Sequence, residues 1–363
     1  MKLFQTTPPR DHQKPSVLSL CLARHGKAIH WMVLSALTFL LCTLPTSPAV
    51  AKSYDNPDTL VVARDGTGEF RTVGEAIEVC RAFMDYHKVI YVKRGTYKEK
   101  LIIPQWIQHI EICGEDRDET VITYDDHANI KSLPPAPTQG GTEMRPMGTF
   151  RTYTLRIDAN DITLKNITIE NNSARLGQAV ALHTVGDRLT FINCRFLGHQ
   201  DTVYTGMANT RLKFTNCYIE GTTDFIFGPS TAWFEGCTIH CKANSYITAA
   251  STPRDVAYGY IFNNCTITCA ANVEKVFMGR PWRDYGYTLF MNCELPRQIR
   301  PEGWHQWRPE AVKTARYMEY NNRGEGAATD GRVAWSRQLT KKEAQQITME
   351  RVFNINDNWN PDL

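Results

Sequence analysis

The sequence lacks features that would place it in several common protein classes. Its longest apolar stretch, residues 31–42, has about twelve residues, which is shorter than the roughly 20 needed to cross a membrane as a helix. No Gly-x-Ser-x-Gly motif is present, which disfavours a serine esterase. The 10 histidines are scattered without metal-ligand spacing, so we expect neither a metal site nor a cofactor.

Net charge is small once the N-terminus is set aside. Residues 1–51 carry a net charge of +4 and residues 52–363 about −1. A nearly neutral chain gives no support for nucleic-acid binding or for attachment to a membrane surface through basic residues.

The N-terminus has the pattern of an export signal. The apolar stretch is preceded by Arg24 and Lys27 and is followed by Ala49-Val-Ala51, an A-x-A cleavage pattern. We therefore predict a signal peptide at residues 1–51 and a mature domain at residues 52–363, which would be secreted, without integral membrane association, as a monomer. The basic leader is longer than usual, so an uncleaved anchor or a mis-started reading frame is the alternative.

A short repeat dominates the middle of the chain. From about residue 109 to 300, β-rich stretches with alternating apolar and polar residues are separated by Gly, Asn and Asp. Asparagine recurs at positions 166, 193, 216, 264 and 292, with Gly236 in one copy. A period of about 20 to 28 residues suits one coil of a solenoid, in which each coil buries its apolar face on its neighbours. We predict an all-β fold, a parallel β-helix, with an internal asparagine ladder at the repeated turn.

Five cysteines follow the same repeat position and are predicted to form a buried column of thiols: Cys194, Cys217, Cys237, Cys265 and Cys293. Cys241 and Cys269 make a second matched pair. This pair could form a disulfide across one coil, although packed thiols are the preferred interpretation.

Both ends of a solenoid expose sheet edges and need cover. Thr72 and Glu75 form a capping box that predicts a helix through Met84, and Thr340 and Glu343 predict another over residues 341–350. We expect one short capping helix at each end. Residues 132–148, rich in Pro and Gly, are predicted to be a long loop beside a functional site.

The repeat also places two carboxylates together. Asp201 and Asp224 each lie eight positions after the repeated asparagine, so parallel stacking would bring them about 4.8 Å apart. Acids this close do not ionise independently, which suits acid/base or nucleophilic chemistry. Gln178 and Gln200 are 22 positions apart, about one coil, and would flank the aspartates.

The chain resembles the pectin methylesterases from Leu60 to Pro361. The resemblance is carried by Asp65-Gly-Thr-Gly-Glu-Phe70, Gly148-Thr-Phe-Arg-Thr152, Gln200-Asp-Thr-Val-Tyr204, Asp224-Phe-Ile-Phe-Gly228 and Gly279-Arg-Pro-Trp282. It implies a right-handed parallel β-helix and hydrolysis of C6 methyl esters of galacturonate, with methyl-esterified homogalacturonan (pectin) as the binding partner.

The resemblance also implies a role for each polar residue. Asp224 matches the nucleophile, Arg280 the group that keeps it charged, and Asp201 the general acid and base. Gln178 and Gln200 would stabilise the oxyanion. Trp282 would stack on a sugar ring, and four further residues are candidates for lining the groove, namely Tyr204, Phe225, Thr149 and Trp304.

Alternative interpretations remain open at this point. The aspartates could be turn residues that bond their own backbone, Arg280 a structural ion pair and Trp282 a core residue. A pectate lyase or polygalacturonase would use the same architecture, but a lyase needs a calcium cluster and an inverting glycosidase needs acids roughly 6.5 to 9.5 Å apart. A binding protein without activity is a third alternative.

Overall fold

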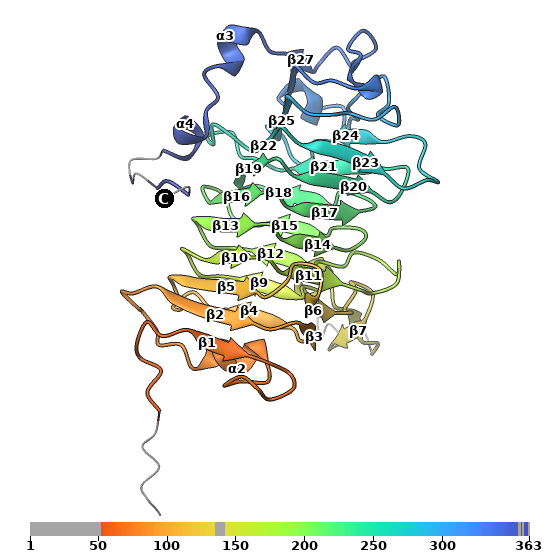
Figure 1. Cartoon of the computed structure of the whole chain (residues 1–363). Helices are drawn as coiled ribbons and strands as arrows, with labels where there is room; N and C mark the ends of the chain where they lie inside the picture. The colour runs from red at the N-terminus through yellow and green to blue at the C-terminus, as the bar shows by residue number, and fades with distance from the viewer. Residues whose placement is uncertain (1–51, 135–141, 355–356, 358, 362–363) are drawn as a thin grey trace, which may run out of the picture. The chain divides into compact units, whose positions relative to one another are not determined.

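The computed structural model describes residues 52–134, 142–354, 357 and 359–361. Residues 54–363 belong to one compact unit, and the predicted signal peptide lies outside the described residues. Three parallel sheets make up most of this unit, and successive strands of the chain pass from one sheet to the next (Figure 1). A single chain that winds through three parallel sheets in this way is a parallel β-helix, as the repeat predicts.

The largest sheet, sheet A, has 11 strands. They are β1 (Leu60–Val62), β2 (Lys88–Val92), β5 (Ile110–Gly114), β10 (Thr163–Lys165), β13 (Leu189–Ile192), β16 (Arg211–Thr215), β19 (Thr231–Glu235), β22 (Tyr260–Asn263), β25 (Tyr287–Met291), β26 (Arg316–Tyr320) and β27 (Arg337–Gln338). Sheet A thus begins before the repeat recognised in the sequence and continues beyond it.

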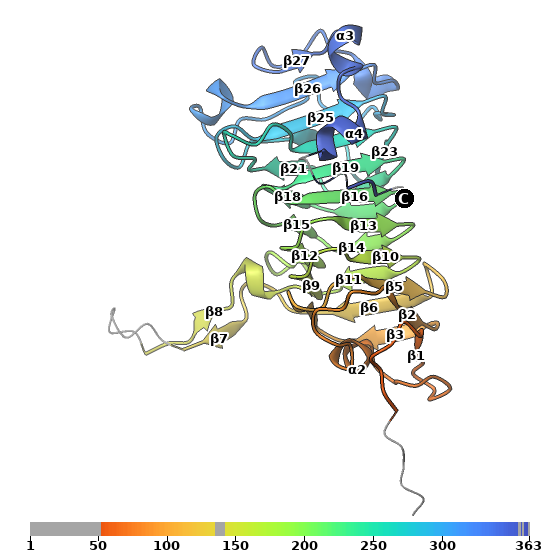
Figure 2. The same ribbon diagram turned by 90° about the vertical axis from the view of Figure 1, so that its left-hand side faces the viewer.

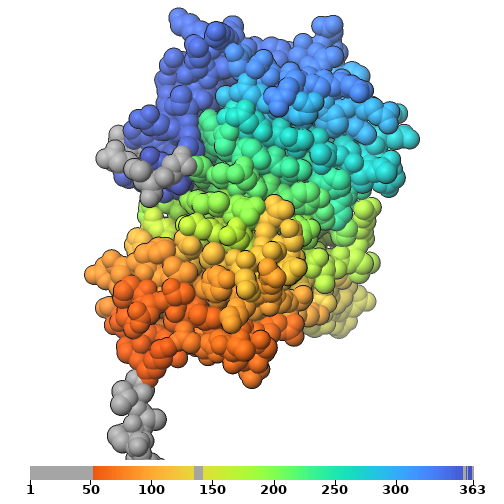
Figure 3. Space-filling view, viewed as in Figure 1, coloured from red at the N-terminus to blue at the C-terminus, as the bar shows by residue number. Residues whose placement is uncertain are grey.

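Sheets B and C have seven strands each. Sheet B contains β3 (Gly95–Lys98), β6 (Thr120–Tyr124), β11 (Thr168–Asn171), β14 (Arg195–Leu197), β17 (Tyr218–Gly221), β20 (Thr238–Cys241) and β23 (Thr266–Cys269). Sheet C contains β4 (Leu101–Ile103), β9 (Leu155–Ile157), β12 (Leu182–Thr184), β15 (Val203–Thr205), β18 (Ile226–Gly228), β21 (Tyr246–Ala250) and β24 (Phe277–Gly279). The coils lie directly on one another in the space-filling view, where the colours change in layers (Figure 3).

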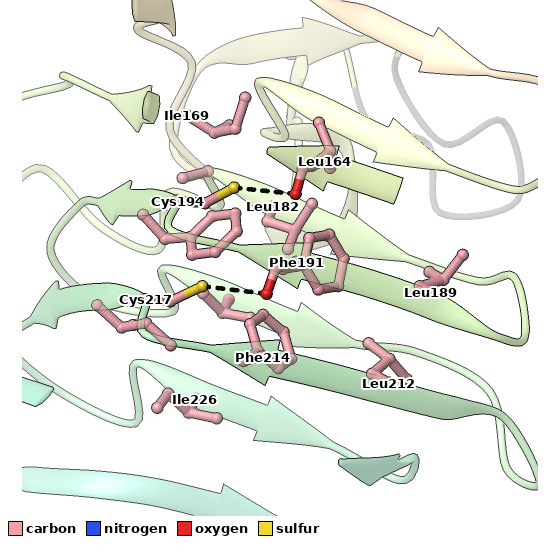
Figure 4. Packing of buried hydrophobic residues seen from close by; sticks show 14 of the residues in the cluster. Leu164, Ile169, Leu182, Leu189, Phe191, Cys194, Leu212, Phe214, Cys217 and Ile226 are labelled. Atoms are coloured by element: carbon pink, nitrogen blue, oxygen red, sulfur yellow. Dashed lines mark hydrogen bonds between the residues drawn. The ribbon is translucent and has the colours of Figure 1, made fainter. Parts of the chain in front are cut away.

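Side chains of equal position stack inside the coils. Phe191, Phe214, Phe234 and Phe262 form a column whose successive rings lie 4.4 to 4.6 Å apart. The five repeat cysteines are buried and free, as predicted. Their thiols donate to backbone carbonyls of the preceding coil, for example Cys194 to Leu164 and Cys217 to Phe191 (Figure 4). The core is therefore built by repetition along the stack.

The repeated asparagine occupies the bend between sheets A and B. Asn166, Asn193, Asn216, Asn264 and Asn292 all have φ between 49° and 56°, and Gly236 has φ 61°. Asparagine and glycine tolerate this left-handed conformation better than other residues, which explains why they share the position. The predicted internal asparagine ladder forms only in part. Asn193 donates to Asn166 at 2.8 Å and Asn321 donates to Asn292 at 2.9 Å, whereas Asn264 donates to Glu235. Asn216 and Asn264 are exposed, so these two positions are not internal.

Short helices are present, but their extents differ from the prediction. The Thr72 capping box starts α2 (Val73–Glu78), which packs Val73, Ala76 and Ile77 into the core at the β1 end. Helix α2 ends at Glu78, six residues before Met84, with Val79 as its C-cap. The chain then turns, and Phe83 has φ 57° and donates its N–H to the Trp106 carbonyl.

The C-terminal region also departs from the prediction of one capping helix. Thr340 starts α3 (Lys341–Ala344), and Thr348 caps a separate helix, α4 (Met349–Phe353). Helix α4 lies beside sheet A (Figures 1 and 2), where Val352 and Phe353 pack with Trp233 and Ile261. The C-terminal segment therefore covers a face of sheet A as well as its end. None of the described helices has the length and apolarity that a membrane span requires.

The predicted loop at residues 132–148 contains a short antiparallel ladder. Strands β7 (Lys131–Leu133) and β8 (Arg145–Pro146) pair at its base and project from the coils (Figure 2). Gly148 N–H bonds the Ala128 carbonyl, and Ala128 N–H bonds the Gln178 carbonyl. The base of this hairpin thus joins the backbone of a predicted site residue. Three further short turns of 3₁₀-helix are η2 (Thr149–Arg151), η3 (Ala311–Lys313) and η4 (Glu325–Ala327).

Candidate active site

The predicted site residues gather where the chain enters sheet C. Val203 and Ile226 are register partners on β15 and β18, and Asp201 and Asp224 each stand two positions before them. Asp201 N–H bonds the Thr223 carbonyl at 3.1 Å, which continues the ladder up to the aspartates. The two acids therefore occupy equivalent positions on adjacent coils, about one strand spacing apart.

The local backbone explains why the carboxylates leave the core. Asp201 has φ 66° and Asp224 has φ 49°, a left-handed conformation that aspartate adopts more readily than most residues. The next residue, Phe225, is fully buried in the core, whereas the Asp224 carboxylate bonds a side chain from another coil. The bend thus turns Asp224 to the side opposite Phe225.

Arg280 holds Asp224 by two hydrogen bonds. Arg280 directly follows β24, and its Nε donates to Asp224 Oδ1 at 3.0 Å while Nη2 donates to Oδ2 at 2.6 Å. The Asp224 side chain is only 6% exposed. Burial alone raises the pKa of Asp224, and the hydrogen bonds and charge of Arg280 lower it again, with burial the larger effect. Arg280 therefore favours a buried carboxylate in its charged form.

The environment of Asp201 favours the protonated form. Burial raises the pKa of Asp201 well above its ordinary value, and the nearby Asp224 raises it further, while Arg280 lowers it to a smaller extent. The environment thus separates the pKa values of two acids of the same type, and Asp224, which Arg280 binds, ionises more readily than Asp201. This is the arrangement in which one carboxylate acts as a nucleophile and the other carries a proton.

The two amides lie on the same ladder. Gln178 and Gln200 are both partly buried, and Ala179 N–H bonds the Gln200 carbonyl at 3.1 Å. Gln200 directly precedes Asp201, so the backbones of both glutamines lie at the entrance to sheet C, on the coils that carry the acids. His199 is not a good base here, because burial and the nearby charges of Lys242 and Arg175 lower its pKa to about 4.

An aromatic stripe crosses the outward face of sheet C. Its successive rings are Phe150, His183, Tyr204, Phe227 and Trp282, with neighbouring centroids 4.8 to 6.2 Å apart. Tyr204 and Phe227 are register partners, and Trp282 follows Arg280 by two positions. Tyr204 and Trp282 therefore stand on the surface where they were predicted, and Thr149 adjoins the stripe as the neighbour of Phe150.

Two predicted lining residues are wrong. Phe225 has no exposed surface and Trp304 has 1%, and both belong to the main core. Trp304 packs against Phe290 and Tyr317, so neither side chain can contact a ligand on the surface.

The sequence reasoning overlooked Phe227 and His183, although a signal for the first was present. Phe227 stands three positions after Asp224, as Tyr204 stands three after Asp201. Extending the repeat offset by three residues would have found it. His183 has no matching aspartate, and only its register with Tyr204 places it on the stripe.

The described residues contain no group of three or more His, Cys, Asp or Glu side chains arranged to hold a metal ion. The chemistry that the site offers comes from a carboxylate pair, one guanidinium and two amides above a parallel β-helix. A buried carboxylate bound by an arginine beside a second buried acid, on a parallel β-helix, supplies the groups that a β-helical ester hydrolase would use.

Comparisons with known proteins agree with this class. The family model named Pectinesterase matches residues 59–356, and the chain belongs to the pectinesterase family, whose name implies a carboxylic ester hydrolase. Pectinesterase 31 of Arabidopsis thaliana is 36% identical over 286 residues, which cover 78% of this chain and 88% of that protein. The chain spans about half the length of other curated relatives, among them a probable pectinesterase/pectinesterase inhibitor of Brassica napus.

Solved structures share the fold. The pectin methylesterase from carrot superposes with a TM-score of 0.73 and 31% identity, covering 83% of this chain and 94% of that one. A pectin methylesterase in complex with a hexasaccharide superposes with a TM-score of 0.69 and 28% identity, covering 84% and 98%. These proteins are right-handed parallel β-helices, in agreement with the predicted fold class.

Proposed function

We propose that this protein hydrolyses the C6 methyl esters of galacturonate in pectin, releasing methanol and leaving free carboxylates. The observation that carries the proposal is the paired bond from Arg280 to Asp224 beside an in-register second acid, Asp201. Family membership supports it, as does the printed description of a structural relative that is bound to a hexasaccharide.

In the first half of the reaction, Asp224 is the nucleophile. One of its oxygens attacks the C6 carbonyl carbon, and the carbonyl oxygen becomes an oxyanion that accepts hydrogen bonds from Gln178 and Gln200. The intermediate then collapses and the C6–OCH₃ bond breaks. Asp201 gives its proton to the departing oxygen, so that methanol leaves and an acyl anhydride with Asp224 remains.

In the second half, Asp201 is the base. Its carboxylate takes a proton from a water molecule as the water oxygen attacks the C6 carbonyl carbon of the anhydride. The bond to Asp224 breaks, the galacturonic acid is released, and both aspartates return to their starting states. One ester and one water are consumed, and one acid and one methanol are formed.

The aromatic stripe supports a carbohydrate substrate. Tyr204 and Trp282 are partly exposed and follow Asp201 by three positions and Arg280 by two, and flat apolar rings of this kind pack against sugar rings. Thr149 adjoins the same surface. We assign methyl-esterified homogalacturonan as the ligand of this stripe, and propose that the protein acts as a secreted monomer after removal of residues 1–51.

Methanol release from highly methylated pectin tests the proposal directly. The wild-type protein should release methanol without shortening the polymer, and Asp224→Ala should abolish this while its circular dichroism spectrum is unchanged. Asp255→Ala, at an exposed aspartate, is the matched control and should keep full turnover. Shorter oligosaccharides without methanol would identify a depolymerase, and unchanged methanol release by Asp224→Ala would remove Asp224 from its assigned role.

A further inference from the structure

The guanidinium of Arg280 is enclosed by two aromatic rings. Its central carbon lies 3.9 Å from the ring centroid of Tyr246 and 3.9 Å from that of Trp307. Neither ring carries a role in the reaction proposed above. We propose that Tyr246 and Trp307 are positioning residues, which clamp Arg280 between them so that it keeps both hydrogen bonds to Asp224.

One side of the clamp is built into the sheet. Tyr246 begins β21, and its backbone carbonyl accepts the hydrogen bond of Asp224 N–H at 2.9 Å. Its ring stacks on Phe277, the register partner on β24, at 5.5 Å and 13°. His305 packs against both rings at 5.0 to 5.2 Å. Phe277 and His305 therefore hold the Tyr246 ring in place where it packs on Arg280.

The other side of the clamp comes from a segment that the core anchors. Trp304 is buried, and its backbone forms a bridge with Gly279, the residue before Arg280. His305 N–H bonds the Gly279 carbonyl at 3.0 Å. Trp307 follows two positions later and remains 38% exposed. The burial of Trp304 thus contributes indirectly to the site, because it holds the segment that brings Trp307 over Arg280.

Stacking suits a guanidinium better than any other charged group. The faces of the ion are weakly hydrated and pack on aromatic rings, while its N–H groups point outward in the plane. With both faces of Arg280 covered, rotation out of that plane would require a ring to move. The in-plane Nε and Nη2 therefore stay directed at the two oxygens of Asp224.

The clamp should act through the ionisation of Asp224. Besides Arg280, the charged and titratable groups facing this region are Asp201, His305, Arg300 and Tyr317. Burial, Arg280 and Arg300 all lower the pKa of His305, so His305 loses its proton at a lower pH than an ordinary histidine does. If the clamp is removed, Arg280 is held less firmly against Asp224. It then offsets less of the increase in pKa that burial causes, so the pKa of Asp224 rises.

The test rests on the proposed function and measures the pH dependence of kcat/KM for methanol release with Trp307→Ala. We expect the acid limb to move upward by about 0.5 to 1 pH unit, the size of a partly desolvated cation–π contact, with KM unchanged. Trp307→Phe should restore most of the wild-type profile, and Trp307→Leu, which keeps apolar bulk without a ring, should not. Trp106→Ala, at a tryptophan 52% exposed, is the control.

Two results would overturn the inference. An increase in KM with an unmoved acid limb would make Trp307 a sugar contact, and a fall in kcat with an unmoved limb would make its role structural. Failure of the proposed function looks different, because the wild-type protein itself would then release no methanol.

Discussion

Asp201 and Asp224 stand at the same position of consecutive coils, each two residues before a register-paired strand residue. Equal position does not give them equal chemistry, because only Asp224 is bound by Arg280. The asymmetry of the site therefore comes from a residue 56 positions further along the chain, and most of the predictions below depend on it.

The first prediction concerns pH. Burial raises the pKa of Asp224, so its ionised fraction falls as the pH drops through a value above the ordinary pKa of about 4. Asp201 must be protonated for the first step, and its pKa is raised well above the ordinary value, so turnover should also decline at high pH. We expect a bell-shaped profile of kcat/KM between pH 3 and 10. A flat acid side down to about pH 3 would contradict an ionised Asp224.

The second prediction concerns Arg280. Arg280→Ala leaves Asp224 buried without its charged partner, and kcat/KM should fall by about 10² to 10³, the effect of losing a buried charge-assisted contact. Arg280→Lys should retain part of the activity, because an ammonium supplies charge but not two parallel bonds. Initial rates of methanol release measure both variants. Equal activity of the lysine variant and the wild type would show that the paired geometry is unnecessary.

The third prediction concerns the amides. Replacing Gln178 or Gln200 by Ala removes a donor that acts mainly on the oxyanion, so kcat should fall by about 10² to 10³ with little change in KM. Steady-state kinetics on methylated oligogalacturonates separates the two constants. Gln105→Ala, at an exposed glutamine, serves as the control. A change in KM alone would assign the amides to ground-state binding.

The fourth prediction concerns stability. Phe214 is fully buried between Phe191 and Phe234, whose rings lie 4.5 and 4.6 Å away. Phe214→Ala should lower the free energy of unfolding by about 3 to 5 kcal/mol, because a cavity is left in the column. Phe83→Ala, at a phenylalanine 76% exposed, should change it by less than about 0.5 kcal/mol. Urea unfolding followed by circular dichroism compares the two, and equal effects would contradict the role of the column.

The repeat was recognisable because it recurs in the residues that face inward. Asn193, Cys194 and Phe191 return at Asn216, Cys217 and Phe214, and this periodicity was enough to predict the parallel β-helix and the column of cysteines. The coils outside residues 109–300 lack the full signature, so β1, β2, β26 and β27 escaped notice. They pack on the ends of the same stack, where Asn321 after β26 continues the asparagine position, with φ 48° and a hydrogen bond to the Asn292 side chain, but no cysteine follows it.

The helices show where local signals are insufficient. The capping boxes at Thr72 and Thr340 correctly predicted where α2 and α3 begin. Their ends were wrong, because a helix end in this protein depends on packing against the coils. After α2 ends at Glu78, for example, the chain turns and the Phe83 N–H bonds the Trp106 carbonyl.

The sequence by itself determined the periodicity, and with it the stacking of Asp201 beside Asp224, because a constant offset along a repeat becomes a constant position in space. Only the tertiary structure decided which surface each aromatic residue occupies. Trp304 and Trp307 are three positions apart, yet one is buried in the core and the other covers Arg280. The segment that holds both tryptophans does not belong to the repeat, so their side-chain directions follow from contacts with neighbouring coils and not from spacing along the chain.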